Sequence, residues 1–249
     1  MKKKITAICL CVALLAIAVV GATLAYFTDT DAKDNVFTTG KVDITLKENF
    51  DEGNAKLLPG SQTMNPVTKQ VSITLAKDSE KSYVWYEWLI PAALDSIDGS
   101  TGTNNIIHVN SLGRTWDKYR ENSNYWAADQ TAALPLEQTW DHDPEEELKS
   151  GVGPEGFLGT ETIDGIVYNK YLVLYHGVLG PGDETTTAMS QVYMDSKVDT
   201  DGNGNYFIGN TQINYDFSKD IHIIVRAYGI QAATFADVYA AYNAYQAQK

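Results

Sequence analysis

Cysteine is almost missing from this 249-residue chain, and both copies, Cys9 and Cys11, lie inside a hydrophobic run at the N-terminus. Once that run is removed, the remaining chain holds no cysteine at all. Disulfides, thiolate metal sites and cysteine nucleophiles are then excluded from it, so its stability must come from packing.

The motifs of common catalytic classes are also missing. There is no His-Glu-x-x-His stretch, whose helical spacing would place two imidazoles on one zinc ion, and no Gly-x-Ser-x-Gly elbow or phosphate-binding glycine loop. We interpret the acidic cluster of residues 141–147 as solvated surface, and the four histidines as satisfied structural residues. These are His108, His142, His176 and His222. No residue is therefore predicted to be catalytic.

The N-terminus has the three parts of an export signal. Residues 2–4 are lysines, residues 5–20 are almost entirely apolar, and residues 23–25 place small side chains where a signal peptidase reads them. We expect residues 1–25 to be a signal peptide that is cut between Ala25 and Tyr26. The alternative is a membrane anchor, but the apolar run is shorter than the roughly 20 residues needed to cross the hydrocarbon, so we expect no stable membrane insertion after cleavage.

The expected mature chain is strongly acidic. Without the lysines at positions 2–4 it has 16 basic against 32 acidic residues, a formal charge of −16. Binding to nucleic acid or anionic lipid requires Lys and Arg to displace counterions, so neither is an expected partner. The charge suits a soluble extracellular protein.

Apolar and polar residues alternate along much of the chain, which is typical of half-buried antiparallel strands. Residues 42–46 and 67–75 alternate in this way, whereas residues 82–90 and 171–179 are apolar on both faces and are predicted to be central strands. Further strands are expected at residues 105–109, 185–194 and 220–228. The predicted fold is all-β, an antiparallel jelly-roll-like β-sandwich spanning residues 41–249.

Two segments depart from this alternation. Residues 111–154 are long, polar and aromatic, with Trp116, Trp126 and Trp140, and are expected to form an insertion with a short helix or two. Residues 234–248 have apolar side chains at helical spacing, which predicts a short C-terminal helix with Thr234 as its N-cap.

One stretch has the spacing of a calcium-binding loop. Asp199, Asp201, Asn203 and Asn205 are candidate oxygen ligands, with Gly204 at the position where such loops turn sharply. The twelfth position holds Asn210 instead of glutamate, and the flanking residues are typical of strands. A polar hairpin turn is therefore the favoured interpretation, with calcium as the alternative and no other cofactor expected.

The N-terminal region resembles a known family. The string from Thr23 to Asp29, then Asn35-Val36-Phe37, then the stretch from Gly40 to Ile44 resembles the N-terminus of the TasA/camelysin family, whose signal peptides are processed by a SipW-type signal peptidase. Residues 58–60, 83–91 and 223–235 are similar to later parts of the same family.

The resemblance implies a function. It implies a bacterial protein that is secreted to the extracellular matrix or cell surface and self-associates into fibres of a biofilm matrix, with a SipW-type signal peptidase and an accessory anchoring protein as partners. Residues 26–40 would be the strand donated to a neighbour, with Tyr26, Phe27, Val36 and Phe37 as its apolar anchors. The alternatives are a disordered N-terminal tail, a camelysin-like metal-dependent peptidase, and a surface adhesin that binds through the Trp-rich insertion.

Overall fold

The computed structural model of this chain describes residues 28–30, 41–61, 64–95, 106–111, 114–116, 135–148, 151–153 and 156–249. For residues 28–30, 110–111 and 114–116 it describes the backbone alone. Strands dominate, and the predicted antiparallel sandwich is confirmed.

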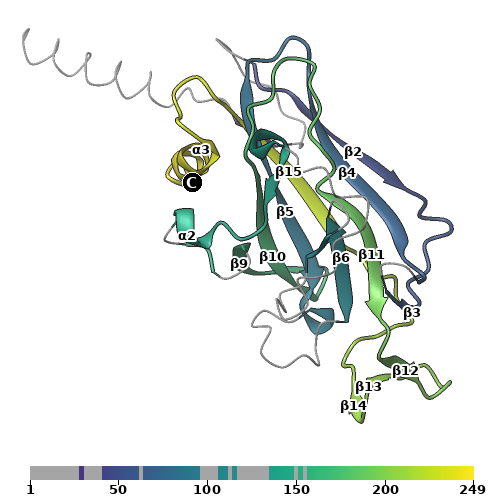
Figure 1. Ribbon diagram of the computed structural model, residues 1–249. Coiled ribbons are helices and arrows are strands. Elements are labelled where there is room, and N and C mark those ends of the chain that lie inside the picture. The colour runs from purple at the N-terminus through teal and green to yellow at the C-terminus, as the bar shows by residue number, and fades with distance from the viewer. Residues whose placement is uncertain are drawn as a thin grey trace, which may run out of the picture.

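Two sheets face each other across the core (Figure 1). The first sheet contains, from one edge to the other, β1 (Thr28–Thr30), β15 (Ile224–Gln231), β5 (Ser82–Pro91), β10 (Ile166–Tyr175) and β8 (Trp140–Asp141), with β9 (Phe157–Ile163) also paired to β10. The second contains β2 (Ile44–Phe50), β4 (Val67–Leu75), β11 (Met189–Asp195), β6 (Ile107–Ser111) and β7 (Arg114–Trp116). The short strand β3 (Pro59–Gly60) pairs with β11 in parallel.

Smaller elements decorate the sandwich. A three-stranded sheet of β12 (Val198–Thr200), β13 (Tyr206–Ile208) and β14 (Thr211–Gln212) projects at the lower end in Figure 1. Among the described residues the helices are α2 (Glu145–Leu148) and α3 (Val238–Gln246), with short 3-10 turns at Ala92–Leu94 and Leu136–Gln138.

Strand β5 shows why its sequence is apolar on both faces. It lies between β15 and β10, and all ten of its residues are buried. Tyr86 and Trp88 belong to the core between the two sheets, whereas Trp85 packs on the opposite face against helix α3. The prediction of a central strand over residues 82–90 is therefore confirmed.

Strand β10 lies earlier in the chain than predicted. The expected strand covered residues 171–179, but β10 ends at Tyr175, and the chain then bends at Gly177, which lies against the backbone carbonyl of Glu137. At its other end β10 begins as a hairpin with β9, through Asp164 and Gly165 at φ of 50° and 80°. An Asp-Gly pair between apolar residues is a strong hairpin signal that the sequence interpretation missed.

Helix α3 covers the outer face of the first sheet through aromatic side chains. Trp85 meets Tyr242 and Tyr245 edge to face, at ring-centroid distances of 5.6 and 5.1 Å. The helix is shorter than predicted, and its N-cap is Asp237, whose carboxylate accepts a hydrogen bond from the backbone N–H of Ala240. The prediction of Thr234 as N-cap is wrong, because residues 232–235 form a turn in which Phe235 N–H donates to Ala232.

Part of the expected insertion is built into the sandwich. Trp140 is 7% exposed, pairs through β8 with β10, and stacks on Tyr86 with a centroid distance of 4.8 Å. Its indole N–H donates to the carbonyl of Thr186. Trp140 is thus a core residue, while Trp126 lies outside the described residues.

Candidate assembly site

Along the side that carries β2 and β15, the two sheets are in close contact at one end and uncovered at the other. Near its start β2 lies close to β15, because Gly229 has no side chain: a Cβ there would come within 3.2 Å of Ile44 Cγ2 and 3.3 Å of Val42 Cγ1. We call the junction between β2 and β15 the seam.

Burial along β2 shows that the seam opens toward the far end of that strand. The residues of β2 that share a face with the core are Ile44, Leu46, Glu48 and Phe50, and in that order they are buried, half-buried, exposed and exposed. Phe50 is 37% exposed although its side chain is on the core-facing side. Residues of the first sheet therefore do not cover the last part of this face.

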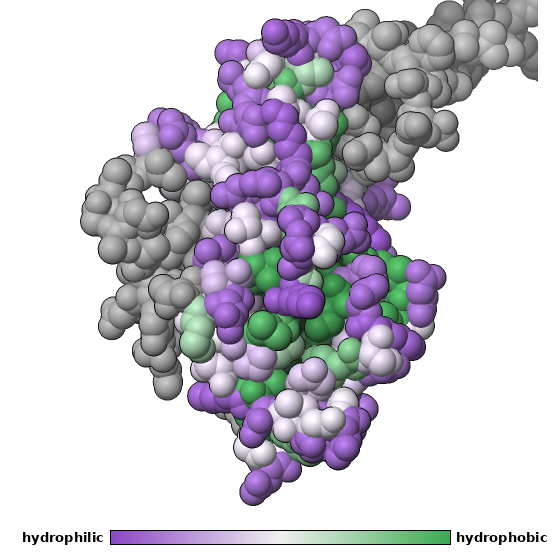
Figure 2. Space-filling model, turned by 90° about the vertical axis from the view of Figure 1, so that its right-hand side faces the viewer, coloured by the Kyte–Doolittle hydropathy of each residue, from purple (hydrophilic) through white to green (hydrophobic). Residues whose placement is uncertain are grey.

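The face turned toward the viewer in Figure 2 is consistent with a seam that is open at one end. Its upper part is mostly hydrophilic, and hydrophobic surface gathers in its lower half. Phe50, Leu58 and Met64 are among the exposed large apolar side chains of the described residues. A hollow of about 440 Å³ nearby is lined by Leu58, Pro66 and polar side chains at the ends of β2 and β4.

A charged pair lies on the core-facing side at this open end. Lys69 lies on β4 directly across from Phe50, on the same strand face as the core residues Val71 and Ile73. Its ammonium group pairs with the Glu48 carboxylate and lies 4.6 Å from the centre of the Phe50 ring. Lys69 is 8% exposed. A buried lysine is rare unless it is paired, so Glu48 is what makes this position tolerable.

The N-terminal segment reaches the other wall of the seam. Strand β1 pairs antiparallel with β15, with Thr28 opposite Ile230, Asp29 opposite Gly229 and Thr30 opposite Tyr228. No other strand among the described residues pairs with residues 224–227 on the side of β15 away from β5. An unpaired strand edge presents free backbone N–H and C=O groups that can template another strand.

The remaining residues predicted for cleavage and assembly lie outside the described part of the chain. These are Ala25, Tyr26, Phe27, Val36 and Phe37. Their roles stay predictions.

The calcium candidates lie in the hairpin between β12 and β13. The Asp201 carboxylate accepts hydrogen bonds from the backbone N–H groups of Asn203 and Asn205 and from the Asn205 side chain, and these bonds hold the pKa of Asp201 below its ordinary value. Gly202 and Gly204 have positive φ, and Asp199 accepts from the N–H of Thr200. This is the geometry of a polar turn, and calcium binding there stays an untested alternative.

The histidines are dispersed, as their sequence separation indicates. His108 bonds Asp195 at 2.9 Å, His176 lies within 3.1 Å of the Tyr239 hydroxyl and 3.0 Å of the Thr139 hydroxyl, and His142 lies against Trp88. His222 is exposed, so the expectation of a satisfied structural histidine is wrong for it. Within the described residues, no three His, Cys, Asp or Glu side chains come together closely enough to hold a metal ion.

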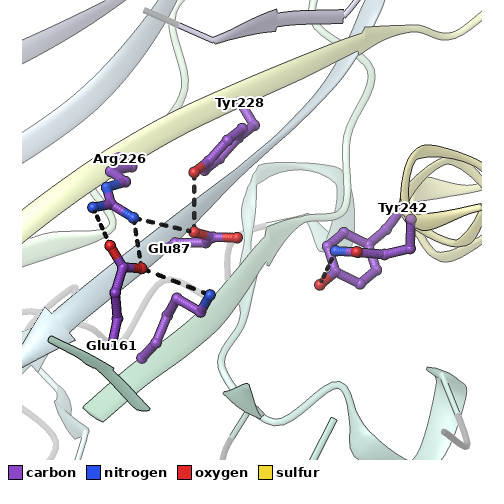
Figure 3. A network of polar contacts seen from close by, with 7 residues as sticks. Glu87, Glu161, Arg226, Tyr228 and Tyr242 are labelled. Carbon is purple, nitrogen blue, oxygen red and sulfur yellow. Dashed lines mark hydrogen bonds and ion pairs between the residues drawn. The ribbon is translucent and has the colours of Figure 1, made fainter. Parts of the chain in front are cut away.

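A buried carboxylate that sequence reasoning missed lies on the outer face of the first sheet (Figure 3). Glu87 is 3% exposed, accepts a hydrogen bond from the Tyr228 hydroxyl at 3.0 Å, and lies 4.0 Å from Arg226. Arg226 donates two hydrogen bonds, of 2.9 and 2.7 Å, to Glu161 and holds the pKa of that carboxyl below its ordinary value. Burial raises the pKa of Tyr228. Alternation places Glu87 on this face, but only the strand order shows that Arg226 neutralises it.

The described residues therefore form an antiparallel β-sandwich with a seam that is closed at one end and open at the other. A family model described as "Camelysin metallo-endopeptidase" matches residues 1–74, so the resemblance to the TasA/camelysin family is confirmed over that part of the chain. The match covers less than a third of the chain. No curated protein and no solved structure matches the chain. No helix among the described residues is long and apolar enough to cross a membrane.

Zinc chemistry finds no support in the residues that the structure describes. The family description names a metallo-endopeptidase, but the sequence has no His-Glu-x-x-His motif. The described side chains also supply no set of ligands for a catalytic metal. We therefore assign no step of peptide hydrolysis to any residue.

Proposed function

We propose that this protein is a secreted structural subunit that self-associates into extracellular fibres of a bacterial biofilm matrix. Assembly follows cleavage after Ala25, when the N-terminal segment of one copy adds as a strand to β15 of another. The observation that carries the proposal is the pairing of β1 with β15 of the same chain, which supports the fit of this part of the N-terminal segment to that edge as an antiparallel strand.

Chain tethering explains why cleavage would control assembly. Before cleavage, Tyr26 and Phe27 continue directly from the hydrophobic signal, so the segment stays held where the signal is held. After cleavage the segment has a free end, and its backbone can pair along the edge of β15 in a second copy. A SipW-type signal peptidase would be the enzyme that releases it.

The energetics favour a strong contact between subunits. Full burial of an apolar side chain such as Val36 or Phe37 contributes about 1.5 to 3 kcal/mol, and pairing adds backbone hydrogen bonds. Ordering a segment of about 12 residues opposes this gain. The open end of the seam, with Phe50 exposed on the core-facing side, offers apolar area for such anchors.

The test compares the chain that starts at Tyr26 with the same chain lacking residues 26–37. Electron microscopy of both proteins at high concentration should show fibres only for the longer chain, and a synthetic peptide of residues 26–37 should stop growth by capping ends. A scrambled peptide is the control, and matched circular dichroism spectra verify that the shorter chain folds. Undiminished growth of the shorter chain would show that assembly uses another surface.

The other function classes give different results in the same samples. A peptidase of the kind that the family description names would cleave casein and lose that activity in chelator. An adhesin would bind a glycan or protein as a monomer. The accessory anchoring protein would be found by its ability to hold fibres on cells.

A further inference from the structure

The tip of the hairpin between β12 and β13 carries the single Asn-Gly pair of the chain, Asn203-Gly204. Residues 201–205 are all exposed. Gly204 has a φ of 92°, and a Cβ placed on it would meet no heavy atom within 4 Å apart from the adjacent residues. Asparagine before glycine is the pair most prone to lose its side-chain amide, because glycine has no side chain to shield its nitrogen.

The hydrogen bonds of this turn leave the backbone nitrogen of Gly204 unengaged. The Asp201 carboxylate accepts from the backbone N–H groups of Asn203 and Asn205, on either side of Gly204, at 2.8 and 3.2 Å. Among the described residues, no acceptor binds the Gly204 N–H itself. This nitrogen can therefore lose its proton to solvent hydroxide and attack a neighbouring carbonyl carbon without first breaking a hydrogen bond.

A second pair in the same turn, Asp201-Gly202, is protected by its contacts. The Gly202 N–H donates to the Thr200 hydroxyl at 3.2 Å, so its nitrogen is engaged. The Asp201 carboxylate accepts hydrogen bonds from the Asn205 side chain and from two backbone N–H groups, and these hold its pKa below its ordinary value. An ionised carboxylate is a poor electrophile, whereas the neutral amide of Asn203 can be attacked. The turn thus favours reaction at Asn203 alone.

We propose that Asn203 is a site of spontaneous deamidation in the folded protein. The Gly204 nitrogen, after losing its proton to hydroxide, bonds to Cγ of Asn203 and closes a succinimide ring. The Cγ–Nδ2 bond breaks, and the amide nitrogen leaves as ammonia after taking a proton from water. A water molecule then opens the ring at either carbonyl and leaves aspartate or isoaspartate at position 203. The net reaction consumes one water and releases one ammonia.

The product changes both the charge and the backbone at the tip of the projecting sheet. Deamidation adds one negative charge beside Asp201, so two carboxylates then repel each other across a turn that one of them now organises. Isoaspartate also lengthens the main chain between β12 and β13 by one carbon. Because the reaction needs no enzyme, the modified fraction increases with the age of the protein. This inference does not depend on the proposed function.

Peptide mapping by mass spectrometry tests the site. The protein that starts at Tyr26 is incubated in its folded state at pH 8, and the mass gain of deamidation is followed over days. We expect Asn203 to react at least tenfold faster than Asn54 or Asn210, which are also exposed but precede residues larger than glycine. Methylation by an isoaspartate methyltransferase should label the same peptide. Equal rates at Asn203 and Asn54 would overturn the proposal.

Two variants supply a second readout by ion-exchange chromatography. The aged protein should develop a more acidic form that elutes with the Asn203→Asp protein. Asn203→Gln is the matched control, because it keeps an amide at this position but would have to close a larger ring, and it should form at least tenfold less of the acidic form. Acidic form that accumulates equally in the Asn203→Gln protein would place the reaction at another residue.

The folded state and pH separate this mechanism from damage to unfolded chains. The rate at Asn203 should be higher at pH 9 than at pH 6, because the attacking nitrogen has to lose its proton. Incubation in urea, which unfolds the protein, is the comparison for the folded sample. Reaction of Asn203 in urea but not in the folded protein would show that the turn protects this residue, and would overturn the proposal.

Discussion

Gly229 on β15 lies directly against Ile44 on β2, and a Cβ at Gly229 would approach Ile44 Cγ2 to 3.2 Å. This close approach holds the two sheets together at one end of the seam. Four residues further along β2, Glu48 is exposed on the same face. One glycine thus decides where the sandwich is closed, and the seam opens beyond it.

Enlarging residue 229 should therefore destabilise the fold. In Gly229→Leu the added side chain meets Ile44, Val42 and Val84, and overpacking of this kind costs about 1 to 3 kcal/mol. Chemical denaturation gives the free energy of unfolding. Gly53→Ala is the control, because the one atom a Cβ would meet there lies at 3.6 Å, and it should change stability by less than about 0.5 kcal/mol. Equal stability of the Gly229→Leu and unaltered proteins would show that the sheets separate without cost.

The ion pair of Glu161 and Arg226 should make stability depend on pH. Arg226 lowers the pKa of Glu161 below its ordinary value of 4.5, so the stabilisation is complete above that pH and is lost as pH falls through the lower value in the folded state. Glu161→Gln should lose about 1 kcal/mol at pH 7, a modest figure because both side chains are about one-third exposed. The difference between the two proteins should shrink in acid.

The measurement is denaturant unfolding of both proteins at neutral and strongly acidic pH. Glu146→Gln, in the exposed first turn of α2, is the matched control and should leave stability unchanged at both. A Glu161→Gln deficit that stayed constant with pH would contradict the ion-pair assignment.

Capping of helix α3 separates the sequence prediction from the structure. Asp237→Ala removes the carboxylate that binds Ala240 N–H and should cost about 1 kcal/mol. Thr234→Ala should cost less than about 0.5 kcal/mol, because Thr234 lies in the turn before the helix and does not cap it. Thermal unfolding followed by near-ultraviolet circular dichroism reports on the aromatic cluster beneath α3. A larger loss of stability for Thr234→Ala than for Asp237→Ala would show that Thr234 caps the helix, as the sequence predicts.

The hairpin between β12 and β13 should be indifferent to calcium. Asp201 already accepts three hydrogen bonds from the turn, so the melting temperature should be the same in calcium and in chelator. A rise of several degrees in calcium that vanished in an Asp199→Ala, Asp201→Ala variant would instead establish a site.

Local sequence was informative wherever one residue's environment depends on its near neighbours. Strand β4 was predicted at its observed limits, because strict alternation over residues 67–75 leaves one register in which the apolar side is buried. Strand β5 was recognised as central because both of its faces are apolar. The limits of β10 and the cap of α3 were wrong, since several residues there satisfy the same local pattern and contacts such as that of Gly177 with Glu137 decide between them.

The seam itself came only from the tertiary structure. Alternation shows that Glu48 and Lys69 occupy core-facing positions, where two charges look like an error in the pattern. The pairing of β1 with β15, and the approach of Gly229 to Ile44, join residues about 200 positions apart, and such long-range contacts leave no periodic trace in the chain. By itself the sequence determined which faces of the strands are apolar, and it predicts an export signal. The tertiary structure decided which two edges meet and where they part, because strand neighbours are chosen by packing across the whole domain.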